Sequence, residues 1–133
     1  MKLPMKNISI LGSTGSIGCN TLDVVALFPE RFRVLGLSAC ENIERLEGQI
    51  RRFRPAMVSL NNGKAATLLK ERCGDLGVEI LSGVEGLIRV STLPEVDVVV
   101  SAIAGSAGLI QTLSAVKAGK PVALDNKETM VMA

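Results

Sequence analysis

A short apolar run that leads into a glycine-rich loop, close to the start of the chain, restricts the fold most. Residues 7–18 read Asn-Ile-Ser-Ile-Leu-Gly-Ser-Thr-Gly-Ser-Ile-Gly, with glycines at positions 12, 15 and 18. Glycine lets the chain turn sharply and lets backbone N–H groups approach an anion without an obstructing Cβ. A helix that begins near Ser16 adds the positive end of its dipole at the same place. The pattern predicts a strand, a phosphate-binding loop and a helix in succession.

The glycine spacing is G-x-x-G-x-x-G, a variant of the dinucleotide fingerprint G-x-G-x-x-G. No Gly-Lys-Ser/Thr follows the loop, which excludes a Walker A phosphate loop. We therefore expect four residues to face the diphosphate of a dinucleotide: Thr14, Gly15, Ser16 and Ile17.

Strand and helix patterns alternate along the rest of the chain. Apolar runs predict strands over 7–11, 32–39, 57–60, 78–81, 96–103 and 122–124. Helices are predicted over 16–28, 65–73 and 84–90. Two more are predicted, one around Ile43, Leu46, Ile50 and Phe53 and one around Leu109, Leu113 and Val116. The apolar face of the first helix contains Ile17, Val24, Val25 and Phe28. This alternation predicts an α/β fold, a doubly wound parallel sheet that forms one Rossmann-like dinucleotide-binding domain over residues 1–133.

Composition narrows the class of protein. With 15 basic and 13 acidic residues, no Trp or Tyr and a net charge of +2, the chain lacks a nucleic-acid surface. The three cysteines have no metal-ligand spacing and no histidine accompanies them, which indicates reduced thiols in a cytoplasmic protein. The apolar stretch over 96–103 is far too short to span a membrane. The last residues, 129–133, have no polar tail, so we expect a domain cut from a longer protein.

Polar residues follow several predicted strands, at the sheet edge where ligands bind in such folds. Glu41, 23 residues after Gly18, fits either the acid that binds a ribose 2′-hydroxyl or an acid at a helix start. Asn42 fits a helix cap as well as a ribose or phosphate ligand. Lys127 suits an anionic substrate such as a phosphate ester, or a solvated helix position. No nucleophile–base pair and no metal cluster is visible, so the chain is expected to bind a cofactor without forming a full catalytic site.

Three segments together resemble the 1-deoxy-D-xylulose 5-phosphate reductoisomerases. Residues 10–18, continued by 21–25, resemble the family's N-terminal signature; residues 102–109 are similar to its A-I-x-G-x-A-G-L stretch, and 126–128 match its N-K-E motif. The resemblance covers the whole chain, which corresponds only to the N-terminal NADPH-binding domain of the family. It implies that the parent enzyme converts 1-deoxy-D-xylulose 5-phosphate, a phosphorylated sugar, to 2-C-methyl-D-erythritol 4-phosphate for isoprenoid synthesis. It further implies a homodimer and a Mg²⁺ or Mn²⁺ ion held by a D-S-E stretch beyond Ala133, so that this fragment alone is inactive.

The resemblance also implies roles for individual residues. The four residues of the glycine loop would contact the diphosphate of NADPH, and Asn42 would contact its adenosine ribose and the 2′-phosphate. Cys40 and Glu41, beside Asn42, are further candidate cofactor-binding residues. Asn126 and Glu128 would lie against the cofactor, and Lys127 would reach the substrate as a catalytic residue. The chain departs from the family pattern at Cys40 and Glu41, where Gly and then Lys or Arg are usual, and at Asp125, where Ala is common. Two other functions stay open: the cofactor domain of a semialdehyde or homoserine type of NAD(P) dehydrogenase, and a nucleotide-sensing module.

Overall fold

A computed structural model describes residues 5–102, 122–124 and 130–132. The sheet contains β1 (Lys6–Leu11), β2 (Phe32–Ala39), β3 (Met57–Leu60), β4 (Glu79–Ser82), β5 (Val98–Ser101), β6 (Val122–Leu124) and β7 (Met130–Met132). The helices are α1 (Ser16–Ala26), α2 (Ile43–Phe53), α3 (Gly63–Cys73) and α4 (Gly83–Ser91), with a 3₁₀ turn, η1 (Gly74–Leu76). The predicted helix around residues 109–116 and the loops at 104–108 and 125–128 lie outside the described residues.

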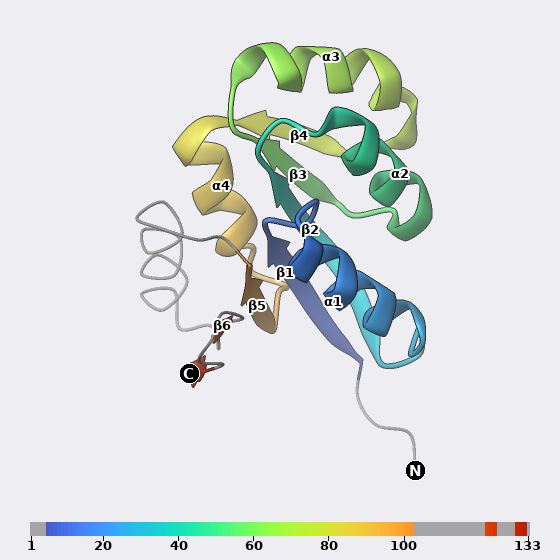
Figure 1. Ribbon diagram of the computed structural model, residues 1–133, viewed down its shortest axis with the longest axis vertical. Helices are drawn as coiled ribbons and strands as arrows, with labels where there is room; N and C mark the ends of the chain where they lie inside the picture. The colour runs from blue at the N-terminus through green and yellow to red at the C-terminus, as the bar shows by residue number, and fades with distance from the viewer. Residues whose placement is uncertain (1–4, 103–121, 125–129, 133) are drawn as a thin grey trace.

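The described strands form one sheet in the order β4-β3-β2-β1-β5-β6-β7, and the pairs from β4 to β6 are parallel (Figure 1). The chain adds strands outward from β1 to β4 and then returns to the other side of β1 with β5. This order confirms the predicted doubly wound sheet. It also places the reversal of strand order between β1 and β5, and ligands bind beside such a reversal at the carboxyl edge of the strands.

Two apolar cores cover the two faces of the sheet. Helices α1, α2 and α3 pack on one face, where Leu22, Leu46 and Leu69 are buried in one apolar cluster with Ile8 and Ile10. Helix α4 covers the opposite face with Val90, which packs with residues of β1, β2, β3 and β5 (Figure 1). No helix in the described ranges has the length and apolar character that a membrane span needs.

Helix α1 and strand β5 are shorter than predicted, and one further strand is present. Helix α1 ends at Ala26, and it buries Gly18, Leu22 and Val25, whereas Val24 is 54% exposed and Phe28 40% exposed. The Leu27 N–H closes a tighter turn onto Val24 O, two residues before Pro29. Strand β5 begins only at Val98, because the preceding residues form a turn from Leu93 to Val96. Strand β7, which pairs antiparallel with β6, was not predicted.

Candidate functional site

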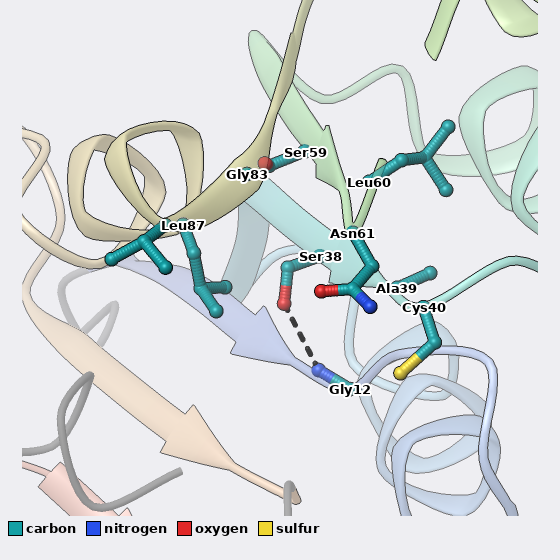
Figure 2. A pocket seen from close by; sticks show the side chains of 10 residues that line it. Gly12, Ser38, Ala39, Cys40, Ser59, Leu60, Asn61, Gly83 and Leu87 are labelled. Atoms are coloured by element: carbon teal, nitrogen blue, oxygen red, sulfur yellow. Dashed lines mark hydrogen bonds between the residues drawn. The ribbon is translucent and has the colours of Figure 1, made fainter. Parts of the chain in front are cut away.

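The glycine-rich loop of residues 12–17, here called the phosphate loop, joins β1 to α1 and is anchored at its start to β2. Gly12 adopts a positive φ of 80°, a conformation that glycine reaches without steric cost. The N–H groups of Gly12 and Ser13 both donate to the carbonyl of Ser38, at 3.0 and 2.8 Å. Gly12 N–H also donates to the Ser38 hydroxyl oxygen at 3.1 Å (Figure 2). The loop therefore leaves the sheet in a fixed direction.

The first turn of α1 presents unpaired backbone donors. Within the described part of the chain, the N–H groups of Thr14, Ser16 and Ile17 have no acceptor. Gly15 occupies the N-cap position without a capping side chain, and the first turn contains no acidic residue. Gly15 and Ser16 are exposed. An anion placed here would satisfy the donors and meet the positive end of the helix dipole, so the geometry fits a diphosphate.

Helix α2 holds the phosphate loop from behind. The side-chain amide of Gln49, which is 8% exposed, donates to the carbonyl of Ser13 at 2.8 Å. One turn earlier, the Arg45 guanidinium donates to the carbonyl of Thr14 at 2.9 Å. In a trans peptide the C=O of one residue and the N–H of the next point in opposite directions. Drawing these two carbonyls toward α2 therefore turns the N–H groups of Thr14 and Gly15 away from it.

The loop after β2 carries the other predicted cofactor residues that the structure describes. Asn42 caps α2, because its side-chain oxygen accepts from the N–H of Arg45 at 3.1 Å. The capping alternative for Asn42 is thus confirmed, and a ligand role stays a prediction. Glu41 is exposed, and its carboxylate lies 3.5 Å from the side-chain nitrogen of Asn62, which precedes α3. The carboxylate of Glu41 therefore leans toward the loop between β3 and α3.

Removing the Asn42 cap should lower stability by about 1 kcal/mol, because a helix N–H loses its acceptor. Asn62 caps α3 in the same way, with a 2.8 Å bond from the N–H of Ala65, so Asn62→Ala is a matched control. Chemical denaturation of Asn42→Ala, Asn62→Ala and Asn42→Asp should show similar losses for the two alanine variants and little loss for the aspartate. A stable Asn42→Ala protein would contradict the capping role.

A hollow of about 100 Å³ opens beside the phosphate loop, at the carboxyl ends of β1, β2 and β3. Figure 2 shows Ser38, Cys40 and Asn61 gathered near Gly12, with Leu87 of α4 on the other side. Its full lining is Gly12, Ser38, Ala39, Cys40, Ser59, Leu60, Asn61, Gly83, Val84 and Leu87. Its wall is mainly apolar, and polar groups lie on its rim.

The structure brings two of the predicted groups together. Gly12, at the start of the phosphate loop, and Cys40 both line the hollow, and Arg45 in the helix that Asn42 caps donates to the carbonyl of Thr14. Asp125 and the predicted residues Asn126, Lys127 and Glu128 lie outside the described residues. Among the described residues, no three His, Cys, Asp or Glu side chains form a group that could hold a metal ion.

The comparison with known families decides the assignment. The sequence model of 1-deoxy-D-xylulose 5-phosphate reductoisomerase matches residues 8–133, almost the whole chain. The chain belongs to this family. A reductoisomerase of Chlorobium phaeobacteroides is 53% identical over 129 residues, and one of Geobacter sp. strain M21 is 52% identical over the same length. Each alignment covers 97% of this chain but 34% of the relative, so the chain spans about a third of the length of these reductoisomerases.

Solved reductoisomerase structures share the fold. A crystal structure of the enzyme in complex with NADPH, fosmidomycin and magnesium has a TM-score of 0.88 at 38% identity, over 93% of this chain and 31% of that chain. The Zymomonas mobilis reductoisomerase in complex with NADPH has a TM-score of 0.87 at 33% identity, over 93% of this chain and 32% of that chain. The resemblance based on the three sequence segments is thereby confirmed.

Arg45 and Gln49 were not predicted as site residues. They lie four positions apart, on one face of α2 beside the buried Leu46 and Ile50. A glutamine inside an apolar stripe is the sequence feature that could have indicated a polar role in the interior. Its partner, the carbonyl of Ser13, is 36 residues away in the chain and becomes apparent only in the folded structure.

Proposed function

We propose that this chain is the NADPH-binding domain of a 1-deoxy-D-xylulose 5-phosphate reductoisomerase. The open run of backbone donors at Thr14, Ser16 and Ile17 is the observation that carries the proposal, because it fits a diphosphate. Membership of the family and the NADPH bound in solved relatives support the choice of cofactor. The family match favours this enzyme over a semialdehyde or homoserine dehydrogenase.

In this proposal the diphosphate of NADPH lies on the N–H groups of the phosphate loop. The adenosine end extends past Cys40, Glu41 and Asn42, and its base lies in the hollow against Leu60 and Leu87. NADPH, when bound, supplies the hydride that reduces the aldehyde formed from the isomerised sugar phosphate. The domain's task is positioning: a loop held rigidly by β2 and α2 fixes the cofactor without a change of shape.

The remaining assignments follow from the resemblance. Asn126 and Glu128 would lie against the cofactor, and Lys127 would anchor or polarise the phosphorylated substrate. A divalent Mg²⁺ or Mn²⁺ ion would be held by acidic residues of a separate catalytic domain in the longer parent protein, and would act there as a Lewis acid. We further propose that the parent is a cytoplasmic homodimer. The free thiols of Cys19, Cys40 and Cys73 agree with a reducing compartment.

Binding and turnover test the two halves of the proposal. Calorimetric titration of the chain with NADPH should show saturable binding at one site. The chain alone should give no product from 1-deoxy-D-xylulose 5-phosphate with Mg²⁺ or Mn²⁺ present, whereas a longer protein that contains this domain should give 2-C-methyl-D-erythritol 4-phosphate. Absence of NADPH binding would refute the cofactor role. Product formation by the chain alone would refute the two-domain division.

Cofactor protection of Cys40 should locate the adenosine end. Cys40 is exposed on the rim of the hollow, whereas Cys73 is buried and its burial raises the pKa of its thiol. Maleimide should therefore modify Cys40 readily and Cys73 hardly at all in the native protein. NADPH at about ten times its Kd should slow the modification of Cys40 about tenfold, because only the free fraction reacts.

Peptide mass spectrometry over a time course would follow each cysteine separately. The modification rate of Cys73 serves as the internal control for unfolding. If NADPH binds but leaves the rate at Cys40 unchanged, the adenosine end does not pass the hollow.

A further inference from the structure

Arg45 is a cation at the junction of the two cofactor loops. It is exposed, it lies in the first turn of α2, and it uses its guanidinium to bond the carbonyl of Thr14 at 2.9 Å. In the described ranges no carboxylate lies within ion-pair distance of it. By contrast, Arg51 and Arg52 of the same helix pair with Glu47 at 3.1 Å and Asp23 at 3.6 Å. Arg45 therefore holds the phosphate loop, and no carboxylate of the described residues neutralises its positive charge, which can attract an anionic ligand.

The geometry of a guanidinium suits this double task. It carries five N–H donors in a planar fork, and the bond to Thr14 uses one of its nitrogens, Nη1. The other donors of such a fork match the oxygens of a phosphate group. Because Nη1 is held by the loop, the orientation of the group is set before a ligand arrives.

The acidic residues around the loop after β2 would repel the 2′-phosphate of NADPH, so binding of NADPH requires a cation nearby. Glu41 and Glu44 are exposed acids that flank the Asn42 cap. An acid after the second strand of a dinucleotide fold favours an unphosphorylated ribose and repels a 2′-phosphate. The carboxylate of Glu41 leans toward Asn62, whereas Arg45 bonds the phosphate loop. We therefore expect the 2′-phosphate of the adenosine ribose to lie beside Arg45, away from the carboxylate of Glu41.

We propose that Arg45 recognises the 2′-phosphate of NADPH, in place of a cation at position 41. The inference rests on the proposed function, because it assigns the residue that selects the phosphorylated form of the same cofactor. Arg45 thus has two roles: its bond to Thr14 positions the loop for either cofactor, and its remaining donors discriminate between NADPH and NADH.

The test measures dissociation constants for NADPH and NADH from the fluorescence of the reduced nicotinamide. Arg45→Met should weaken NADPH binding by roughly 10- to 100-fold more than NADH binding, the range expected for lost charge-assisted hydrogen bonds. Arg45→Lys should restore part of the preference. Adding Glu41→Lys to Arg45→Met should restore it through the other position.

Two variants of α2 act as controls. Gln49→Met removes the other support of the phosphate loop and should weaken both cofactors equally. Arg51→Met removes a cation that pairs with Glu47 and should leave the ratio of the two constants unchanged. An unchanged ratio in Arg45→Met would overturn the assignment of Arg45.

A third ligand separates this failure from failure of the proposed function. Adenosine 2′,5′-bisphosphate carries the 2′-phosphate without a nicotinamide. If the unmodified chain binds neither the dinucleotides nor this bisphosphate, the proposed function is wrong and the assignment of Arg45 falls with it. If the chain binds them and Arg45→Met weakens the bisphosphate as it weakens NADPH, the assignment is supported.

Discussion

Gly18→Ala should destabilise the chain by about 3 kcal/mol or more and reduce NADPH binding at least about 100-fold. A Cβ at position 18 would lie 2.2 Å from the carbonyl oxygen of Gly12 and 2.6 Å from the Cα of Ser13. Both are backbone atoms of the phosphate loop, so no side-chain rotation relieves the overlap. Overpacking of this kind costs about 1–3 kcal/mol, and more where the neighbours cannot move. Because α1 must shift away from the loop, the donor array is lost together with stability.

The matched control for this variant is Gly48→Ala. Gly48 lies within α2, and a Cβ there would meet no atom within 4 Å. Alanine in a helix interior is favoured over glycine by about 1 kcal/mol, so this variant should gain stability and keep its affinity. Thermal unfolding and NADPH titration measure both quantities. A Gly18→Ala chain with native stability and affinity would show that α1 does not pack closely on the loop.

Ser16→Asp should separate binding from stability more clearly than any other change. Ser16 is exposed and is the first residue of α1, so an aspartate places a carboxylate beside the unpaired N–H groups. Interaction with the helix dipole should raise stability by about 0.3–1 kcal/mol. The same charge should repel the diphosphate by about 4 kcal/mol at close range and thereby reduce NADPH affinity about 1,000-fold.

Ser16→Asn is the control, since it has nearly the same shape without the charge. Its affinity for NADPH should stay within about threefold of the unmodified chain, well below the cost of a charged group. Denaturant unfolding and NADPH titration of the unmodified chain, Ser16→Asp and Ser16→Asn measure both effects, the gain in stability and the loss of affinity. If Ser16→Asp binds NADPH normally, the diphosphate does not lie at the start of α1.

The parts of the fold that follow from local patterns were predicted from the sequence. The glycines mark the phosphate loop in the sequence, and the backbone geometry requires two of them: Gly12 for its positive φ and Gly18 for its close approach to the loop. The apolar positions of α2, with Leu46 and Ile50 fully buried, follow helical spacing. Continuous apolar runs indicated strands that are covered on both faces.

The parts that depend on distant partners were not predicted. The prediction that Val24 lies on the buried face of its helix was wrong. Gly18 is buried but adds no apolar side chain, so the apolar residues of the sequence indicate a face that is shifted from the buried one. The side-chain position of Glu41 depends on Asn62, which is 21 residues away. Gln49 has the polarity of a surface residue, and only the carbonyl of Ser13 explains its burial. Such pairings arise from the topology of the sheet and not from local spacing.

Binding of the diphosphate at the phosphate loop can be followed through the backbone N–H signals of the chain by nuclear magnetic resonance during titration with NADPH. We expect the signals of Thr14, Ser16 and Ile17 to move the most, downfield, as their N–H groups gain the diphosphate as an acceptor. Signals from the far end of α1, near Val24, should barely move. If NADPH saturates the chain and the three loop signals stay in place, the phosphate loop does not bind the cofactor.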